Sequence, residues 1–339
     1  MLGKGFGGAE RSFVDTALAL AARGHDVQAI CHAGFVKRDL LEGVPNLTLE
    51  TIKAGGEMDF ITPMRIARLL RDFKPDIVHT QLKRAAWHGG RGASKVGVPV
   101  VSKLHNYVQL ERYKHVHILI GTTEDQRRHA LDLGWPEERI TVIPNFSRVV
   151  PVAEARAPVN RPLKMLSYGR YVHKKGFDVL LKAFAGLLAE GVDAELTIGG
   201  KGPELEALNA LAKELGIDDN VKLGVWIDDV AVALDEADVF VLPSRDEPFG
   251  IVMLEAMARG IPIVTTKTQG PVQVLSDETA KLVEIDSVDD LLHGMQAVAS
   301  DPQQSLSMAS QALKLYRETY HEDAVLPRLE ALYRSVSSR

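Results

Sequence analysis

The sequence PSRDEPFGIVMLEAMARG at residues 243–260 has the pattern of a tight turn followed by a helix. The apolar run ADVFVL at residues 237–242 comes just before it and is typical of a buried parallel strand. Gly260 follows the apolar helical segment, and glycine commonly ends helices. The stretch therefore predicts a strand–turn–helix unit, the repeating element of α/β proteins with parallel sheets.

The turn of this unit is suited to an anionic ligand. Pro248 fits the first turn of a helix, and Gly250 lets a ligand approach the backbone closely. The free N–H groups at the helix start, together with the positive end of the helix dipole, attract an anion. Glu247 precedes the helix and Glu255 lies within it, so carboxylates bracket the turn. A nucleotide sugar combines an anion with hydroxyl groups, whereas compensation of the helix dipole explains only one of the two glutamates.

The segment EPFGIVMLE resembles the E-x7-E element of retaining glycosyltransferases with the GT-B fold, in particular those of glycosyltransferase family 4. The resemblance implies that Glu247 acts beside the donor sugar and that Glu255 holds the ribose hydroxyl groups. It also implies that Phe249, Gly250 and Ile251 contact the donor.

Length and composition are those of a globular protein with two domains. The chain has 339 residues, of which 45% are hydrophobic and 25% charged, and its net charge of −5 gives no sign of nucleic-acid binding. The single cysteine, Cys31, excludes an internal disulfide. Neither an apolar run of membrane-spanning length nor a signal peptide is recognisable. A cytoplasmic location is expected, with or without association with the inner face of a membrane.

Strand and helix patterns alternate along both halves of the chain. They predict an α/β protein with two doubly wound, Rossmann-like parallel sheets that face each other across a cleft. The run PVAEARAPVNRP at residues 151–162 is rich in Pro and Ala, and it predicts a linker. We expect an acceptor-side domain at residues 1–155 and a nucleotide-sugar-binding domain at residues 162–320. The family resemblance implies that a C-terminal helix at residues 321–339 returns to the first domain.

The first residues, MLGKGFGGAERS, are unusual for such a domain. They begin close to a glycine-rich turn, so the strand expected before that turn is short or missing. Gly7, Gly8 and Glu10 resemble the family's G-G-x-E turn. This resemblance implies that Gly8 contributes to donor binding.

Two cations follow the first strand predicted for the second half, in the segment YGRYVHKKGF. Arg170 offers a bidentate fork and Lys175 a point charge at the start of the next helix, which together suit a diphosphate. A solvated turn is the alternative, because Lys and Arg are common on surfaces. The segment also resembles the family's G-R-x4-K-G element, which implies that both cations hold the donor diphosphate during catalysis.

The family resemblance implies two further donor contacts. Gly200 belongs to the glycine-rich turn GGKGP, although any tight turn can require glycine. Val225 stands where family members meet the base, next to Trp226, which is equally suited to packing. The sequence does not distinguish a UDP-sugar from a GDP-sugar. Gln269 and Gln273 depart from the family's G-G-P-x-E turn, which puts the shape of the donor pocket in question.

In the first half, His105 follows the predicted strand at residues 99–104. An isolated histidine is more often structural than functional. The family resemblance, however, places His105 beside the donor sugar and the acceptor, where it would orient substrate or stabilise charge. His79 and Lys83 are expected on the acceptor side, with Gln81 placed similarly.

Positive charge is concentrated in residues 81–117, which contain seven Lys or Arg residues and one acidic residue, Glu111. One interpretation is an ordinary solvated helix face. The other is a surface for an anionic acceptor or for peripheral contact with an anionic membrane. The sequence leaves both interpretations open.

The function predicted is a retaining glycosyltransferase that moves a sugar from a nucleotide-diphosphate sugar to an acceptor hydroxyl. The acceptor would be an anionic, carbohydrate or lipid-linked molecule of cell-envelope polysaccharide, lipopolysaccharide or glycolipid synthesis. No His, Cys and Asp cluster has metal-ligand spacing, so a reaction without metal or cofactor is expected. The alternatives are a GT-B phosphorylase, a nucleotide-sugar oxidoreductase or epimerase, and a nucleotide-sugar-binding protein without transferase activity.

Overall fold

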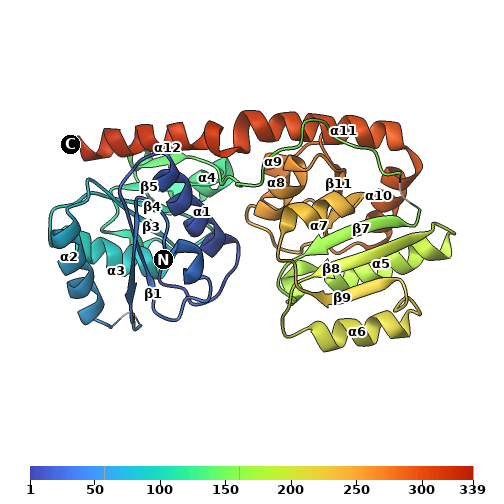
Figure 1. The fold of residues 1–339 in the computed structure, drawn as a ribbon, viewed down its shortest axis with the longest axis horizontal. Helices are drawn as coiled ribbons and strands as arrows, with labels where there is room; N and C mark the ends of the chain where they lie inside the picture. The colour runs from blue at the N-terminus through green and yellow to red at the C-terminus, as the bar shows by residue number, and fades with distance from the viewer. Residues whose placement is uncertain (57, 160, 339) are drawn as a thin grey trace. The chain divides into compact units, whose positions relative to one another are not determined.

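The computed structural model describes residues 1–56, 58–159 and 161–338 and divides the chain into two compact units. The first unit contains Met1–Phe146 and Glu322–Arg339, and the second contains Ser147–His321 (Figure 1). Part of the run at residues 151–162 packs on the second unit, because the N–H of Val152 donates to the carbonyl of Ala258.

The first unit contains two parallel sheets. β1 pairs with β2, and β3, β4, β5 and β6 form the second sheet in that order. Their bounds are β1 Val27–His32, β2 Leu47–Ile52, β3 Val78–Gln81, β4 Val100–Lys103, β5 Ile118–Gly121 and β6 Ile140–Val142.

The two sheets of this unit are separated by a cavity. Met1 forms hydrogen bonds with the edge of β1. Its amino group donates to the Ile30 carbonyl at 2.8 Å, and its carbonyl accepts from the N–H of His32 at 3.1 Å. The cavity has a volume of about 460 Å³, and Ala29 of β1 and Val78 of β3 line it. Within the described residues, β1 and β3 therefore belong to separate hydrogen-bonded ladders.

Helices cover both faces of the strands in the first unit. α12, at the red end of the chain in Figure 1, packs Val325, Leu326 and Leu329 against strand residues that include Val101 and Ile120. The helix bounds are α1 Gly8–Ala22, α2 Ile61–Phe73, α3 Lys83–Ser94, α4 Glu124–Asp132 and α12 Glu322–Ser337, with short helical turns at Arg38–Leu41, Glu111–Tyr113 and Glu137–Arg139.

The second unit is built on one six-stranded parallel sheet in the order β12-β11-β10-β7-β8-β9 (Figure 1). Neighbouring residues of its central strands face opposite sides. Met165 and Val241 join one apolar cluster, and Leu166 and Phe240 join the other. A central parallel strand buried on both faces reads as a continuous apolar run, as ADVFVL does. The strand bounds are β7 Leu163–Tyr168, β8 Ala194–Gly199, β9 Val221–Val225, β10 Val239–Leu242, β11 Ile263–Thr266 and β12 Lys281–Val283.

Three helices of the second unit begin after residues whose side chains cap them. Asp229, Ser287 and Asp301 each accept a backbone N–H from the first turn of the helix that follows. The bounds are α5 Phe177–Ala189, α6 Leu205–Glu214, α7 Val230–Glu236, α8 Ile251–Ala258, α9 Pro271–Val274, α10 Val288–Ser300 and α11 Pro302–Leu315, with a 3₁₀ turn at His173–Lys175 and a π-helical turn at Tyr316–Tyr320.

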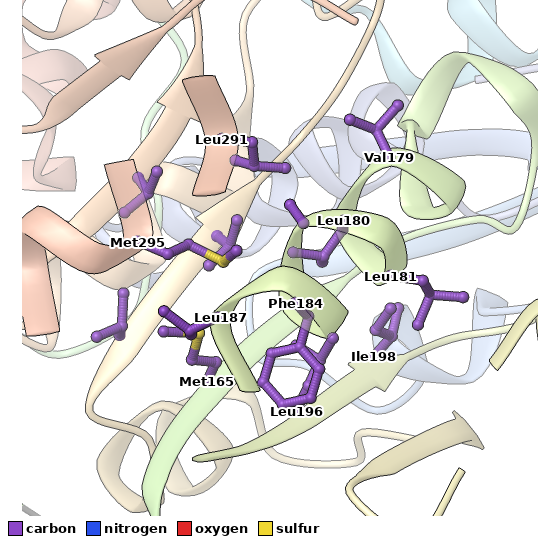
Figure 2. Packing of buried hydrophobic residues seen from close by; sticks show 14 of the residues in the cluster. Met165, Val179, Leu180, Leu181, Phe184, Leu187, Leu196, Ile198, Leu291 and Met295 are labelled. Atoms are coloured by element: carbon purple, nitrogen blue, oxygen red, sulfur yellow. The ribbon is translucent and has the colours of Figure 1, made fainter. Parts of the chain in front are cut away.

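α5 carries the centre of the largest apolar cluster. Figure 2 shows Phe184 and Leu187 of this helix directed toward Leu196 of β8 and Met165 of β7. The side chain of Phe184 is 0% exposed, so its ring is enclosed by this cluster. The packing fixes α5 on the sheet and thereby the turn that precedes it.

We predict that Phe184→Ala lowers the free energy of unfolding by about 3–5 kcal/mol, because it removes a ring and leaves a cavity. Val232→Ala is the control, since Val232 is 52% exposed, and it should change stability by less than about 0.5 kcal/mol. Urea unfolding of both variants measures the difference. Similar values for the two variants would contradict the described packing.

Candidate functional site

Two turns of the second unit meet at the carboxyl ends of β7 and β10. Gly176 directly precedes α5, and a Cβ atom built on it would lie 2.1 Å from the carbonyl oxygen of Pro243. Its φ of 65° is also left-handed, so glycine suits this position in two ways. The β7–α5 turn and the β10–α8 turn are therefore in direct backbone contact.

A short polar contact at this junction joins Lys175 and Glu247. The Nζ atom of Lys175 donates to Oε2 of Glu247 at 2.5 Å, and the two side chains are only 15% and 12% exposed. The cation expected at the donor diphosphate is thus in direct contact with the carboxylate expected at the donor sugar. Limited contact with water strengthens such a pair.

Arg170 lies on the same β7–α5 turn as Lys175 but is exposed. Within the described residues its guanidinium has no ion pair, unlike the ammonium of Lys175. Gly250, the residue before α8, has a left-handed φ of 86° and opens the helix directly after Phe249. An exposed guanidinium and a helix N-terminus on adjoining turns are suited to an anion.

Glu255 lies inside the second unit. It is 1% exposed, and the hydroxyl of Tyr168 donates to its Oε2 atom at 2.6 Å. Tyr168 ends β7, so this bond joins α8 to the central strand of the sheet. Sequence reasoning missed Tyr168, and its place at a strand end beside the glycine turn is the signal that could have found it.

Arg245 is a second residue that sequence reasoning missed. Its guanidinium donates to both carboxylate oxygens of Asp178 at 2.7 and 2.8 Å, to Asp286 at 2.7 Å and to the carbonyl of His173 at 2.9 Å. The hydrogen bond from Arg245 lowers the pKa of Asp178. Arg245 therefore ties the loop that carries Glu247 to the turn that carries Lys175.

The predicted base-side residues also come together. The N–H of Gly200 donates to the carbonyl of Val225 at 2.8 Å, and a Cβ atom on Gly200 would lie 2.0 Å from the carbonyl oxygen of Gly169. Val225 is 39% exposed and Trp226 is 50% exposed, with the ammonium of Lys201 at 5.1 Å from the indole centroid. These residues form an accessible edge beside the β7–α5 turn.

Other predicted donor residues are buried or capping residues. Phe249 is 5% exposed, and its ring packs edge-on against that of Tyr320 at a centroid distance of 6.3 Å. Ile251 is 8% exposed in the first turn of α8. In the first unit, Gly8 begins α1, and the Glu10 carboxylate accepts the N–H of Gly7 at 3.1 Å.

His79, Lys83 and His105 of the first unit lie within or shortly after β3 and β4. Nε2 of His105 is 2.9 Å from Oε1 of Gln81, and Nδ1 of His79 is 2.6 Å from the hydroxyl of Tyr333 on α12. The His79 contact directs that ring toward α12. Lys83 is exposed and begins α3.

A buried lysine lies next to these histidines. Lys103 is 2% exposed and donates to the carbonyl of Pro144 at 3.0 Å. Burial lowers the pKa of Lys103 to about 7 and that of His79 to about 3. The pKa of His105 lies well below its usual value, first because of burial and then because of the Lys103 charge. Both histidines are therefore neutral at pH 7.

Two protein-family models match consecutive parts of the chain. The one described as Glycosyltransferase Family 4 matches residues 6–147, and the one described as Glycosyl transferases group 1 matches residues 153–315. The lipopolysaccharide core biosynthesis glycosyltransferase LpsE of Rhizobium meliloti (strain 1021) is 33% identical over 304 residues, which cover 87% of this chain and 86% of LpsE. The chain belongs to glycosyltransferase family 4. The predicted family is thus confirmed, and the protein is a glycosyltransferase.

A second relative and a solved structure cover almost the whole chain. The lipopolysaccharide core biosynthesis glycosyltransferase LpsD of Rhizobium meliloti (strain 1021) is 30% identical, with 98% of this chain and 97% of LpsD covered. The structure of Anabaena HepE in complex with UDP-glucose superposes with a TM-score of 0.84 at 18% identity, covering 99% and 98% of the two chains. The predicted α/β GT-B fold class of this family 4 glycosyltransferase is confirmed.

Lys103 makes the stability of the glycosyltransferase depend on pH. The pKa of a solvated lysine, 10.5, falls to about 7 for Lys103 in the fold, so the unfolded chain binds more protons between these values. The free energy of unfolding should therefore rise as pH increases from 7 toward 10, because each pKa unit is worth about 1.4 kcal/mol.

Lys103→Met should remove this contribution, so the free energy of unfolding should depend less on pH between 7 and 10. Urea unfolding at several pH values between 7 and 10 tests it, with Lys222→Met as the control because the Lys222 side chain is 67% exposed. The control should keep the slope of the wild type. Equal slopes for Lys103→Met and the wild type would show that Lys103 is charged in the fold at pH 7.

Arg245→Lys should weaken affinity for a nucleoside diphosphate by about tenfold, or about 1.4 kcal/mol. Lysine keeps the charge but loses the planar fork that joins the two turns. The matched control is Arg259→Lys, because Arg259 has the same 15% side-chain exposure and a bidentate contact with Asp235. Isothermal titration calorimetry measures both affinities. Equal losses in the two variants would argue against a positioning role for Arg245.

Proposed function

We propose that this glycosyltransferase transfers a hexose-type sugar, with retention, from a nucleotide-diphosphate sugar to an acceptor hydroxyl. The observation that carries the proposal is the 2.5 Å contact between Lys175 and Glu247 where the β7–α5 and β10–α8 turns meet. This contact combines a cation for a diphosphate with a carboxylate for sugar hydroxyl groups. It lies at the carboxyl end of a parallel sheet, where α/β proteins bind their ligands.

Arg170, Lys175 and the N-terminus of α8 are assigned to the diphosphate. The transition state of sugar transfer is oxocarbenium-like, so negative charge grows on the departing diphosphate. Positive groups that are already in place stabilise that charge without reorganisation. These three groups supply the charge that a divalent cation supplies in other phosphate sites, so we propose a reaction that does not depend on metal.

The nucleoside is assigned to the remaining donor residues. Glu255 accepts hydrogen bonds from the ribose hydroxyl groups, which replace its hydrogen bond from Tyr168. The backbone of Val225 and the Gly200 turn border the base. We propose a UDP-sugar as the donor, since the structure of HepE, which shares the fold, contains UDP-glucose.

Retention is assigned to attack from the face that the diphosphate leaves. In this mechanism the departing diphosphate accepts the proton of the acceptor hydroxyl while the new glycosidic bond forms. Glu247 positions the donor sugar through its hydroxyl groups. His105 is assigned to substrate orientation, because a neutral imidazole can both donate and accept a hydrogen bond at pH 7.

The acceptor is proposed to be a carbohydrate or lipid-linked intermediate of lipopolysaccharide core or related envelope polysaccharide synthesis. LpsE and LpsD, the two relatives described above, are named for lipopolysaccharide core biosynthesis. A lipid-linked acceptor would bring the enzyme to a membrane surface. No helix of the described residues is both long and apolar enough to span a bilayer.

The assignment of Arg170 is tested by Arg170→Ala. Loss of one contact to the developing charge should lower the turnover by roughly a hundredfold, or about 3 kcal/mol of barrier. Release of UDP from UDP-glucose with a lipopolysaccharide core acceptor measures turnover, and calorimetry with UDP measures binding. Lys213→Ala on α6 is the control and should behave like the wild type. Near-normal UDP release by Arg170→Ala would refute the assignment.

A further inference from the structure

The cavity between β1 and β3 is bordered by the edges of both strands. Consecutive residues of β1, Val27–Ile30, line it, and so does every residue of β3, Val78–Gln81. Successive side chains of a strand point to opposite faces of the sheet, so lining by consecutive residues means that the main chain itself borders the cavity. The cavity therefore lies beside two strand edges and not above one face of a sheet.

Main-chain groups of β1 face the cavity. The N–H of Val27 donates to the residue before β2, whereas the N–H of His32 donates to Met1 on the other side. Main-chain donors and acceptors alternate between the two sides of a strand, so odd-numbered residues of β1 pair toward β2 and even-numbered ones face away from it. The N–H and carbonyl of Gln28 are therefore directed into the cavity.

Main-chain groups of β3 face the cavity from the opposite side. The N–H of Val78 donates to the carbonyl of Pro99, toward β4, so those of His79 and Gln81 are directed away from β4. Within the described residues, Nε2 of His79 and Oε1 of Gln28 are buried without a hydrogen-bond partner. Buried polar groups are normally paired, so these edges favour an occupant that carries its own donors and acceptors.

β1 and β3 run in the same direction on the two sides of the cavity. The carbonyl of Met1 accepts the N–H of His32, the last residue of β1. The carbonyl of Leu2 accepts from the guanidinium of Arg84, which follows β3, at 3.5 Å. Both strands thus end at the same short segment, and one extended chain between them would pair in parallel with both.

Met1 already makes the first pair of such an extended chain. Its amino group donates to Ile30 and its carbonyl accepts from His32, which is the pattern of a residue opposite Cys31 in a parallel ladder. Burial lowers the pKa of this amino group to about 5. A peptide N–H in its place would keep the hydrogen bond to Ile30 and would carry no charge to bury. A preceding residue would continue the ladder toward Val27.

The helices around the cavity present apolar side chains to it. Phe13 and Leu20 of α1 line it, and so do Ile66 and Leu70 of α2. α1 and α2 belong to apolar clusters on opposite faces of β4. A strand that is covered by helices on both faces is apolar at consecutive positions. The environment thus suits a continuous apolar run.

We propose that this cavity is the binding site of one extended apolar peptide strand, which leads into Met1 and pairs with β1 and β3 at once. In this register the four residues before Met1 lie opposite Val27–Ile30. Addition of a strand to a sheet edge is a common mode of peptide binding. A small apolar molecule is disfavoured because it would leave the main-chain groups of both edges unpaired. The proposal depends neither on the donor nor on the acceptor of the glycosyltransferase.

Extension of the chain before Met1 tests the proposal. An extension with alternating valine and isoleucine at the four positions should raise the melting temperature by at least about 5 °C, because it buries apolar side chains and pairs both strand edges. A glycine and serine extension of the same length is the control and should shift the melting temperature by less than about 1 °C. A shift no larger than that of the control overturns the proposal.

A second extension separates strand pairing from simple filling of the cavity. Proline at two of the four positions, with valine at the others, keeps the apolar character but removes main-chain donors. This extension should lose most of the rise in melting temperature. An equal rise for the proline and the isoleucine extensions would show that no ladder forms, and it overturns the proposal.

Thiol labelling shows where the extension lies. Cys31, the single cysteine of the chain, is buried, so a cysteine placed two positions before Met1 is the one accessible thiol to follow. In the valine and isoleucine extension it should react with a maleimide at least about tenfold more slowly than in the glycine and serine extension. Equal rates overturn the proposal. Neither readout involves UDP or sugar transfer, so the outcome is independent of the proposed function.

Discussion

The contact between Lys175 and Glu247 depends on two backbone turns that approach more closely than a side chain would permit. Gly176 makes this approach possible, since a Cβ atom there would overlap the carbonyl of Pro243. Arg245 of the β10–α8 turn then holds the two turns together by donating to His173 of the β7–α5 turn and to Asp178 of α5. The position of this ion pair therefore depends mainly on main-chain packing, and the charged side chain of Arg245 adds to it. The same holds for Gly200, which packs against the carbonyl of Gly169 and donates its N–H to the carbonyl of Val225.

Local patterns predict the elements and the motif but not the contacts made across long sequence separations. The apolar run before the EPFG turn indicates β10, and the glycine after the helical segment indicates where α8 ends. β12 has only three residues, too few for a periodic pattern. Arg245 and Tyr168 gain their partners from distant parts of the chain. Composition predicts a linker at the Pro- and Ala-rich run, but it does not reveal the Val152 hydrogen bond to α8.

In the first unit, one of the cations that the sequence suggests for a charged surface is buried. Lys103 is one of the seven cations of residues 81–117, yet β4 lies between β3 and β5 and both its faces are covered. The exposure of Met58 and Phe60 cannot be recognised from the sequence, because both read there as ordinary apolar residues. Burial decides both cases, and burial follows from the arrangement of the elements.

The cavity between β1 and β3 has a consequence for how the first unit opens. Within the described residues, β1 and β2 exchange strand hydrogen bonds with each other and with Met1, and β3 has its own ladder. Separating these two ladders breaks apolar contacts but no strand pairing between β1 and β3. We therefore expect the amide protons of β1 and β2 to exchange with solvent through a partial opening that leaves β3 to β6 protected.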